Sequence, residues 1–176
     1  CSRDWSSDVC SSDLDARLHG AERLPEGRGD LGVWPALVHG GSRLYFVSTG
    51  RAGNLGSADL LVAELSEFGL ATSITNLAAL NTSAAETAPV VANDDRVLYF
   101  AREFALNRRI MMTTRESPSA PWASATPVTE LTSTFEDYPS WISDDLCHLY
   151  FGSTRPLPPA TTNGNVHLYV AERSPL

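Results

Sequence analysis

One pattern occurs three times along this chain and constrains the fold more than any other feature. Each copy has a proline, a short polar turn and the triplet Leu-Tyr-Phe, and the copies lie at residues 35–46, 89–100 and 139–151. The repeated prolines, Pro35, Pro89 and Pro139, are 54 and 50 residues apart. A fixed period of this length is typical of proteins built from repeated structural units. The other features of the sequence are therefore interpreted as parts of a repeat.

Each copy predicts about four short strands. In the first copy, two short apolar runs flank Gly40-Gly41, which indicates a β-hairpin. A polar loop, a third strand and a weaker fourth strand follow. The predicted strands of the first unit are 36–38, 44–47, 59–63 and 74–80. Those of the second are 89–91, 97–100, 110–113 and 122–131, and those of the third are 140–142, 147–151 and 166–171.

The Leu-Tyr-Phe triplets are apolar at consecutive positions, whereas a strand with one face in water would alternate. Both faces of these strands must therefore be covered, as they are between neighbouring blades of a propeller. We predict an all-β fold, a β-propeller fragment of about three four-stranded antiparallel blades. Because closed propellers use about four to eight blades, we expect an open arc with apolar terminal faces. An unrelated β-sandwich is the alternative, in which strands would pair across units.

The repeats also predict the domain organisation. We expect an incomplete propeller over residues 32–176, with repeats at about 32–85, 86–135 and 136–176. Residues 15–31 correspond in position to the segment before the later prolines, and we interpret them as the remnant of a preceding blade. The remaining blades of the parent propeller are then expected partners of this chain.

Residues 1–14 have nothing in common with the repeats. The run 4–14 resembles a translated sequencing adapter, so residues 1–14 are interpreted as non-native and left out of the fold prediction. The alternative is a disordered Ser/Asp-rich tail. Without this segment Cys147 is the one cysteine left, so no disulfide is predicted.

Composition excludes some classes of partner. The chain has 13 Lys and Arg against 21 Asp and Glu, a formal net charge of −8. An acidic chain without a basic cluster is not expected to bind nucleic acid or an anionic membrane surface. No apolar run approaches the roughly 18 residues of a membrane-spanning helix. The absence of Lys, together with abundant Ala, indicates a GC-rich and hence bacterial genome.

The paired aspartates at 94–95 and 144–145 could be read as catalytic carboxylates or a calcium site. The first unit has Gly-Gly at 40–41 instead, which keeps the turn geometry and loses the carboxylates. We therefore interpret all three pairs as turn residues.

Five other residues are candidates for loop bracing or ligand contact. Arg51 and Arg155 follow a serine at corresponding places, and Asp59 opens the next strand of the first unit. We predict an Arg–carboxylate bond that braces the long loop, since the guanidinium suits bidentate pairing. Glu86 and Glu136 each lie three residues before a repeat proline. We predict that they bond backbone between blades, with a shared acidic surface as the alternative.

Cys147 and His148 are adjacent, and His167 lies on the next predicted strand. Neighbouring residues of a strand point to opposite faces, so Cys147 and His148 are not expected to share a metal. The sequence contains no Gly-x-Ser-x-Gly, phosphate-binding Gly-rich loop or His-Glu-x-x-His motif. No catalytic residue, cofactor site or metal site is assigned.

Taken together, the repeat residues resemble the TolB-type, WD-like β-propeller repeat. The shared pattern is Glu/Asp-x-x-Pro, a two-residue acidic or glycine turn, Leu-Tyr-Phe, Ser-x-Arg or Ser-x-x-Arg, and a later Asp-Leu-hydrophobic-Val strand. The matching residues are Pro35, 40–41, 44–46, Ser48, Arg51 and Asp59; Glu86, Pro89, 94–95 and 98–100; and Glu136, Pro139, 144–145, 149–151, Ser153 and Arg155. The second unit departs from the pattern with Ala101-Arg102, so we expect its loop to be held differently.

The resemblance covers about residues 32–173 and implies a protein-interaction platform of the bacterial envelope or an accessory domain of a peptidase. Our first hypothesis is a non-catalytic TolB-like module, a scaffold in a periplasmic or extracellular protein with an unknown protein partner. The alternative is the propeller domain of a larger hydrolase, a serine peptidase or glycoside-active enzyme, whose catalytic part is missing.

Overall fold

A computed structural model describes residues 31–38, 40–105, 107–156 and 165–173. The segment interpreted as non-native, residues 1–14, and residues 15–30 of the predicted blade remnant lie outside these ranges. Among the described residues no helix is long and apolar enough to span a membrane.

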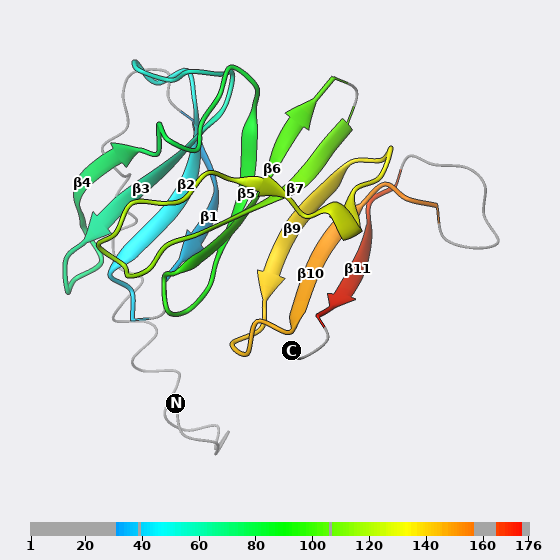
Figure 1. The fold of residues 1–176 in the computed structure, drawn as a ribbon. Coiled ribbons are helices and arrows are strands. Elements are labelled where there is room, and N and C mark those ends of the chain that lie inside the picture. The colour runs from blue at the N-terminus through cyan, green and yellow to red at the C-terminus, as the bar shows by residue number, and fades with distance from the viewer. Residues whose placement is uncertain (1–30, 39, 106, 157–164, 174–176) are drawn as a thin grey trace, which may run out of the picture.

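In the described part of the chain, eleven strands form three antiparallel sheets (Figure 1). The first sheet contains β1 (Leu31–Leu37), β2 (Arg43–Thr49), β3 (Asp59–Leu65) and β4 (Ala71–Asn76). The second sheet contains β5 (Glu86–Val91), β6 (Val97–Phe104), β7 (Asn107–Thr114) and β8 (Thr126–Pro127). The third sheet contains β9 (Asp137–Ile142), β10 (His148–Ser153) and β11 (His167–Glu172).

Every strand pairs with its neighbours in sequence and within its own unit. This pairing excludes the β-sandwich alternative and confirms the all-β prediction of about three antiparallel units in an open arc. The predicted fourth strands are confirmed only in part, since β4 spans Ala71–Asn76 where residues 74–80 were predicted. Residues 122–131 contribute only the two-residue β8 and a 3-10 turn (Thr129–Leu131). Prolines lack the N–H that a ladder needs, and Pro121 and Pro127 limit this strand.

The first strand of each sheet lies innermost, and β5 packs against β1 on one side and β9 on the other. In the first two sheets this strand has a bulge before the repeat proline, where the register shifts between Val33 and Ala36 and between Thr87 and Val90. The bulged residues Trp34 and Ala88 have φ of 51° and 50°. A β-bulge bends its strand and re-aims side chains, which brings the inner strands of neighbouring sheets together.

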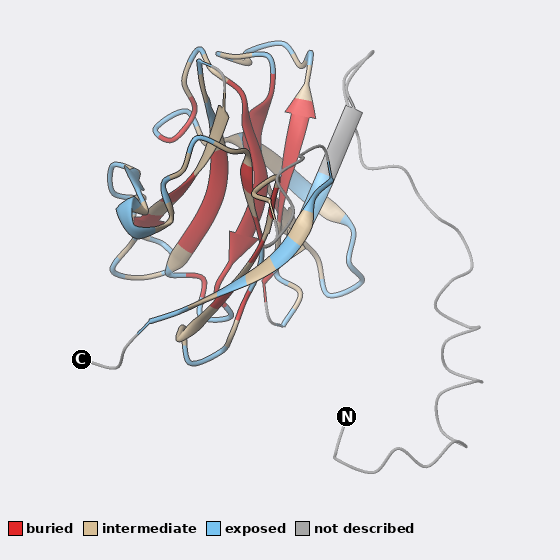
Figure 2. Ribbon diagram, turned by 90° about the vertical axis from the view of Figure 1, so that its right-hand side faces the viewer, coloured by how far each residue is buried: buried red, intermediate tan, exposed pale blue. Residues whose placement is uncertain are grey.

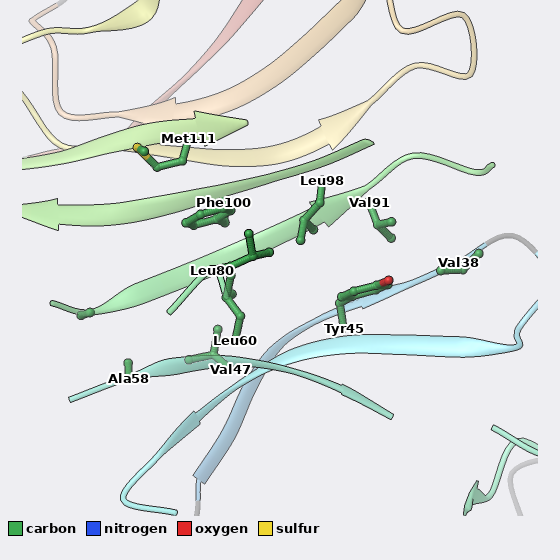
Figure 3. Close-up of a cluster of buried hydrophobic side chains, with 11 residues drawn as sticks. Val38, Tyr45, Val47, Ala58, Leu60, Leu80, Val91, Leu98, Phe100 and Met111 are labelled. Carbon is green, nitrogen blue, oxygen red and sulfur yellow. The ribbon is translucent and has the colours of Figure 1, made fainter. Parts of the chain in front are cut away.

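The strands in the middle of the molecule are largely buried (Figure 2). Two apolar clusters join the three sheets, and Figure 3 shows the first of them. The cluster between the first and second sheets, the first junction, comprises Val38, Tyr45, Val47, Ala58, Leu60, Leu80, Ala85, Val91, Leu98, Phe100 and Met111. The cluster between the second and third sheets, the second junction, comprises Val90, Ala92, Tyr99, Ile110, Ile142, Leu149 and Phe151.

The triplet of the second sheet serves both junctions. Leu98 and Phe100 face the first junction and Tyr99 faces the second, and all three are buried. This arrangement confirms that the triplet strand is covered on both faces. Alternation of side chains across a strand gives two opposite apolar faces only when consecutive residues are all apolar.

The outward face of the third sheet is apolar and exposed. Trp141, Leu168 and Val170 are 53%, 70% and 50% exposed, and Trp141 and Val170 lie opposite Tyr150 in the ladder. The expected apolar terminal face is therefore present here. On the first sheet the corresponding outward residues, including Phe46 and Leu61, are apolar but buried.

Candidate functional site

The connection between the first and second sheets is fastened by a buried carboxylate. Glu86 accepts hydrogen bonds from the Thr82 hydroxyl (2.7 Å), the Thr82 backbone N–H (3.1 Å) and Arg102 Nε (2.8 Å). Arg102 also donates to the carbonyl of Leu80 at 2.5 Å. Because Glu86 is fully buried, its charge depends on these partners. We call this arrangement a clasp.

A second clasp fastens the connection between the second and third sheets. Asp137 accepts hydrogen bonds from the Ser133 hydroxyl (2.7 Å) and Arg155 Nη2 (3.0 Å). Arg155 also donates to the carbonyl of Leu131. In each clasp the hydroxyl residue lies four positions before the carboxylate. The clasp is thus a repeated feature of the fold.

The clasps bear on the sequence analysis at two points. Arg155 pairs with a carboxylate, as predicted, and Arg102 makes the equivalent pair in the second unit. The loop after the second triplet does differ from the others, since two residues separate β6 from β7, whereas nine separate β2 from β3. The guanidinium of each arginine lies 5.3 Å from the ring centroid of the triplet phenylalanine, Phe100 or Phe151. The correction is that Asp137, and not Glu136, takes the place of Glu86.

Glu136 lies beside the second clasp in a different environment. Its carboxylate accepts hydrogen bonds from Tyr138 OH (2.7 Å) and Arg108 Nη1 (3.1 Å), and its side chain is 40% exposed. Burial and the hydrogen bond to Glu136 raise the pKa of Tyr138. Glu136 therefore presents a carboxylate to solvent, whereas Glu86 does not.

Asp59 braces the long loop of the first sheet. Its buried carboxylate accepts hydrogen bonds from the backbone N–H groups of Leu55 (2.8 Å) and Gly56 (2.9 Å) and from Asn76 Nδ2 (2.9 Å). A Cβ at Gly56 would lie 1.9 Å from the carbonyl oxygen of Ala84, so only glycine fits where this loop meets the connection to the second sheet. Arg51 is half-buried in the same loop.

Each hairpin turn has a residue in the left-handed region at the same place, namely Gly41, Asp95 and Leu146, with φ of 69°, 57° and 59°, and in the first turn Gly40 also has a positive φ of 86°. The turn interpretation of residues 40–41 and 94–95 agrees with this geometry. In the third unit, the residues equivalent to 40–41 and 94–95 are 145–146. The sequence analysis named the pair one position earlier, 144–145.

Asp95 has a second role that the sequence did not reveal. Its carboxylate accepts hydrogen bonds from Tyr45 OH (2.8 Å) and Arg43 Nη1 (2.7 Å) and is paired with Arg115. Burial and the hydrogen bond to Asp95 raise the pKa of Tyr45 well above its usual range. The Arg115 guanidinium also lies over Trp122, 4.1 Å from its ring centroid. We call these residues the polar lock of the first junction.

A groove of about 540 Å³ runs between the inner strands of the sheets. It is lined by Trp34, Pro35, Pro89, Glu136, Tyr138 and Pro139, together with Ala88, Val90, Ser140, Gly152 and Val166. Trp34 is half exposed, and its position follows from the bulge before Pro35. Of the predicted site residues, Glu136 alone lines this groove, while Glu86, Asp59 and Arg155 hold buried or half-buried connections.

No family model and no curated protein matches this sequence. Among solved structures, the chain is similar to TolB from Acinetobacter baumannii, with 13% identity and a TM-score of 0.56, over 81% of this chain and 30% of that one. It is also similar to the Hadza microbial sialidase Hz136, with 12% identity and a TM-score of 0.47, over 69% of this chain and 32% of that one. The chain thus spans about a third of the structures it matches. The likeness shows the fold, consecutive blades of a β-propeller.

In a propeller the first strand of each blade lies nearest the central axis. The groove between β1, β5 and β9 is therefore the axial side of these blades, and the clasps join one blade to the next. Across the described ranges, no group of three or more His, Cys, Asp or Glu residues could hold a metal ion. His148 and His167 lie at opposite ends of the β10–β11 ladder, opposite Glu172 and Ser153.

Proposed function

We propose that this chain is part of a non-catalytic, protein-binding propeller module that recognises an extended polypeptide in the axial groove. The observation that carries the proposal is the lining of that groove, where Trp34 and Tyr138 stand beside three prolines and one partly exposed carboxylate, Glu136. We further propose, from the resemblance to TolB-type repeats, that the parent is a bacterial envelope or secreted protein.

The chemistry of the groove favours a peptide. Tryptophan and tyrosine supply large contact areas with few rotatable bonds, and they are enriched at the centres of protein interfaces. Trp34 is 50% exposed and lies in the bulge before Pro35. An exposed aromatic side chain in a groove is available to a partner. We infer that an apolar or proline-containing segment packs on Trp34.

Glu136 sets the charge of the expected partner. Arg108 and Tyr138 orient its carboxylate, and the side chain is 40% exposed at the edge of the groove. The chain as a whole has a net charge of −8. Complementary charge steers association, so a peptide with a basic residue near its apolar anchor suits this groove.

The experiment is a selection of displayed random peptides on the 176-residue chain, followed by affinity measurements on the selected peptides. We expect basic and aromatic or proline-containing peptides whose affinity falls at least about tenfold with Trp34→Ala, since interface tryptophans are common hot spots.

Trp141→Ala is the matched control, because Trp141 is equally exposed, at 53%, on the outward face of the third sheet. It should change the affinity less than twofold. Peptides that bind Trp34→Ala as tightly as the wild type, or that lose as much affinity with Trp141→Ala, would contradict the proposal.

A further inference from the structure

A tryptophan seals the first junction at the polar lock. Trp122 lies edge-on to Tyr45, with ring centroids 6.2 Å apart and planes at 74°. The Arg115 guanidinium lies over the indole ring at 4.1 Å. The segment that carries Trp122 runs along the edge of β7, since Ala123 N–H donates to the Thr114 carbonyl (2.9 Å) and the Thr113 hydroxyl donates to the Ala123 carbonyl (2.6 Å).

The second junction repeats the surroundings of that tryptophan. Tyr99 occupies the place of Tyr45 in the triplet. Arg173 occupies the place of Arg115, because its N–H donates to the Cys147 carbonyl (2.8 Å) just as Arg115 N–H donates to the Arg96 carbonyl (2.9 Å). Leu146 has the left-handed turn position that Asp95 has at the first junction.

These equivalent residues line a cavity of about 410 Å³ between the second and third sheets. The remaining wall is mainly apolar, with Met112, Val128, Leu131, Ile142, Leu149 and Ala171, and it also contains Cys147, Glu130 and Glu172. Tyr99 is almost fully buried there, and burial raises the pKa of its phenol. A cavity of this size with an apolar wall and a few polar groups is typical of a ligand pocket.

Among the described residues, no fourth strand lies along the edge of the third sheet next to the cavity. In the first two sheets the third strand, β3 or β7, pairs with a fourth strand. In the part of the third sheet that the structure describes, β11 pairs with β10 alone. An exposed sheet edge accepts an extended peptide through main-chain hydrogen bonds, while pockets beside it select side chains.

We propose that this cavity is a binding site for a tryptophan side chain carried by an extended peptide that adds as a strand along β11. The indole fills the cavity against Tyr99, and Arg173 lies over its face, as Arg115 lies over Trp122 at the first junction. The site is separate from the axial groove, so the proposal stands or falls independently of the peptide site proposed there.

The chemistry of both partners supports this occupant. Aromatic pairs prefer edge-to-face geometry, and a guanidinium over an indole gains cation–π attraction. Both contacts are present at the first junction. The partner peptide therefore needs one tryptophan, small or proline residues before it, and no bulky charge at the anchor. Residues 117–122 of this chain, Ser-Pro-Ser-Ala-Pro-Trp, have this composition.

The test uses a synthetic peptide with the sequence of residues 116–127, titrated into the isotope-labelled 176-residue chain and followed by NMR. We expect saturable shifts of the amides of Tyr99, Leu149, Ala171 and Arg173. The same peptide with Trp122→Ala should bind at least about tenfold more weakly, as is common when an aromatic anchor is truncated. This comparison changes only the peptide, so protein folding does not affect it.

A pair of protein variants tests the arginine. Arg173→Ala should weaken binding about threefold or more, as loss of a cation–π contact implies. Arg96→Ala removes another exposed arginine from outside the cavity and should leave the affinity unchanged. The proposal is overturned by an absence of saturable shifts at millimolar peptide, by equal binding of the alanine peptide, or by shifts confined to the axial groove or to the outward face of the third sheet.

Discussion

The two junctions between neighbouring blades share one device and differ in another. Both have a clasp, in which an arginine ties a buried carboxylate to the carbonyl of the preceding connection. Only the first has the polar lock, because Asp95 at the turn of the first junction is replaced by Leu146 at the second. The clasp therefore belongs to the repeat, whereas the lock is a property of one junction.

The clasps, which both junctions have, form the arc, whereas the lock closes only the first junction tightly. The clasps fix where each inner strand begins, since Glu86 opens β5 and Asp137 opens β9. The lock joins charged and aromatic side chains at the first junction, whereas the equivalent place at the second junction is a cavity of about 410 Å³. The second junction is therefore expected to be the weaker and the more adaptable of the two.

Asp95→Asn should have the largest effect. The variant keeps a residue that tolerates the left-handed turn but leaves Arg43 and Arg115 without their buried counter-charge. We expect a loss of about 3–5 kcal/mol in the free energy of unfolding, measured with denaturant. Asp94→Asn, in the same turn but exposed, should change it by less than about 0.5 kcal/mol. Similar values for the two variants would show that the lock contributes little.

Removing the arginine from either clasp should destabilise the fold by a similar amount. Arg102→Ala and Arg155→Ala each remove a charged hydrogen bond from a carboxylate that is 0% or 1% exposed. We expect each to lower the free energy of unfolding by about 2 kcal/mol, with values that agree within about 1 kcal/mol. A large loss from one variant and none from the other would mean that the clasp is not a shared device.

Alkaline pH should distinguish the junctions through Tyr45. Its pKa in the folded chain is raised above the unfolded value of about 10. The unfolded state then loses a proton before the folded state does, so stability is complete below about pH 10 and falls above it, by at most about 1.4 kcal/mol per pH unit for this group.

Denaturant unfolding between pH 8 and 11 measures this slope. Tyr45→Phe should flatten it, and Tyr99→Phe, whose hydroxyl has no part in the lock, should flatten it less. An equal change from both variants would contradict a special role for the lock.

The smallest effect on stability is expected on the outward face of the third sheet. Trp141 is 53% exposed and contacts Tyr150 in a tilted arrangement, with ring centroids 5.5 Å apart and planes at 55°. Trp141→Ser should change the free energy of unfolding by less than about 1 kcal/mol. It should reduce self-association, measured by light scattering, because it removes part of an exposed apolar face. Unchanged self-association would indicate that this face is not adhesive.

The sequence predicts the repeat and its strands but not the lock. Period, turn residues and triplets are local features, and they gave the strand order and the two buried faces. Asp95 meets Tyr45 and Arg43 across 50 and 52 residues. Its place in an Asp-Asp turn already has a sufficient local explanation, so nothing in the sequence points to the long-range contacts.

The errors of register have one physical cause. Counting back from the proline equates Glu136 with Glu86, yet Asp137 takes that place. The third inner strand shifts register opposite Tyr150 and Phe151, whereas the second has its bulge between Thr87 and Val90. A bulge adds a residue without changing composition, so sequence spacing alone does not locate it.

Native-state hydrogen exchange tests the unequal junctions most directly. If the first junction is locked and the second is not, β9 and β10 should open as a unit at a lower free energy than β5 and β6, since sheets in series depend on their interfaces. Asp95→Asn should bring the two values closer together. Equal protection of both sheets in the wild-type chain, or a more protected third sheet, would contradict the account.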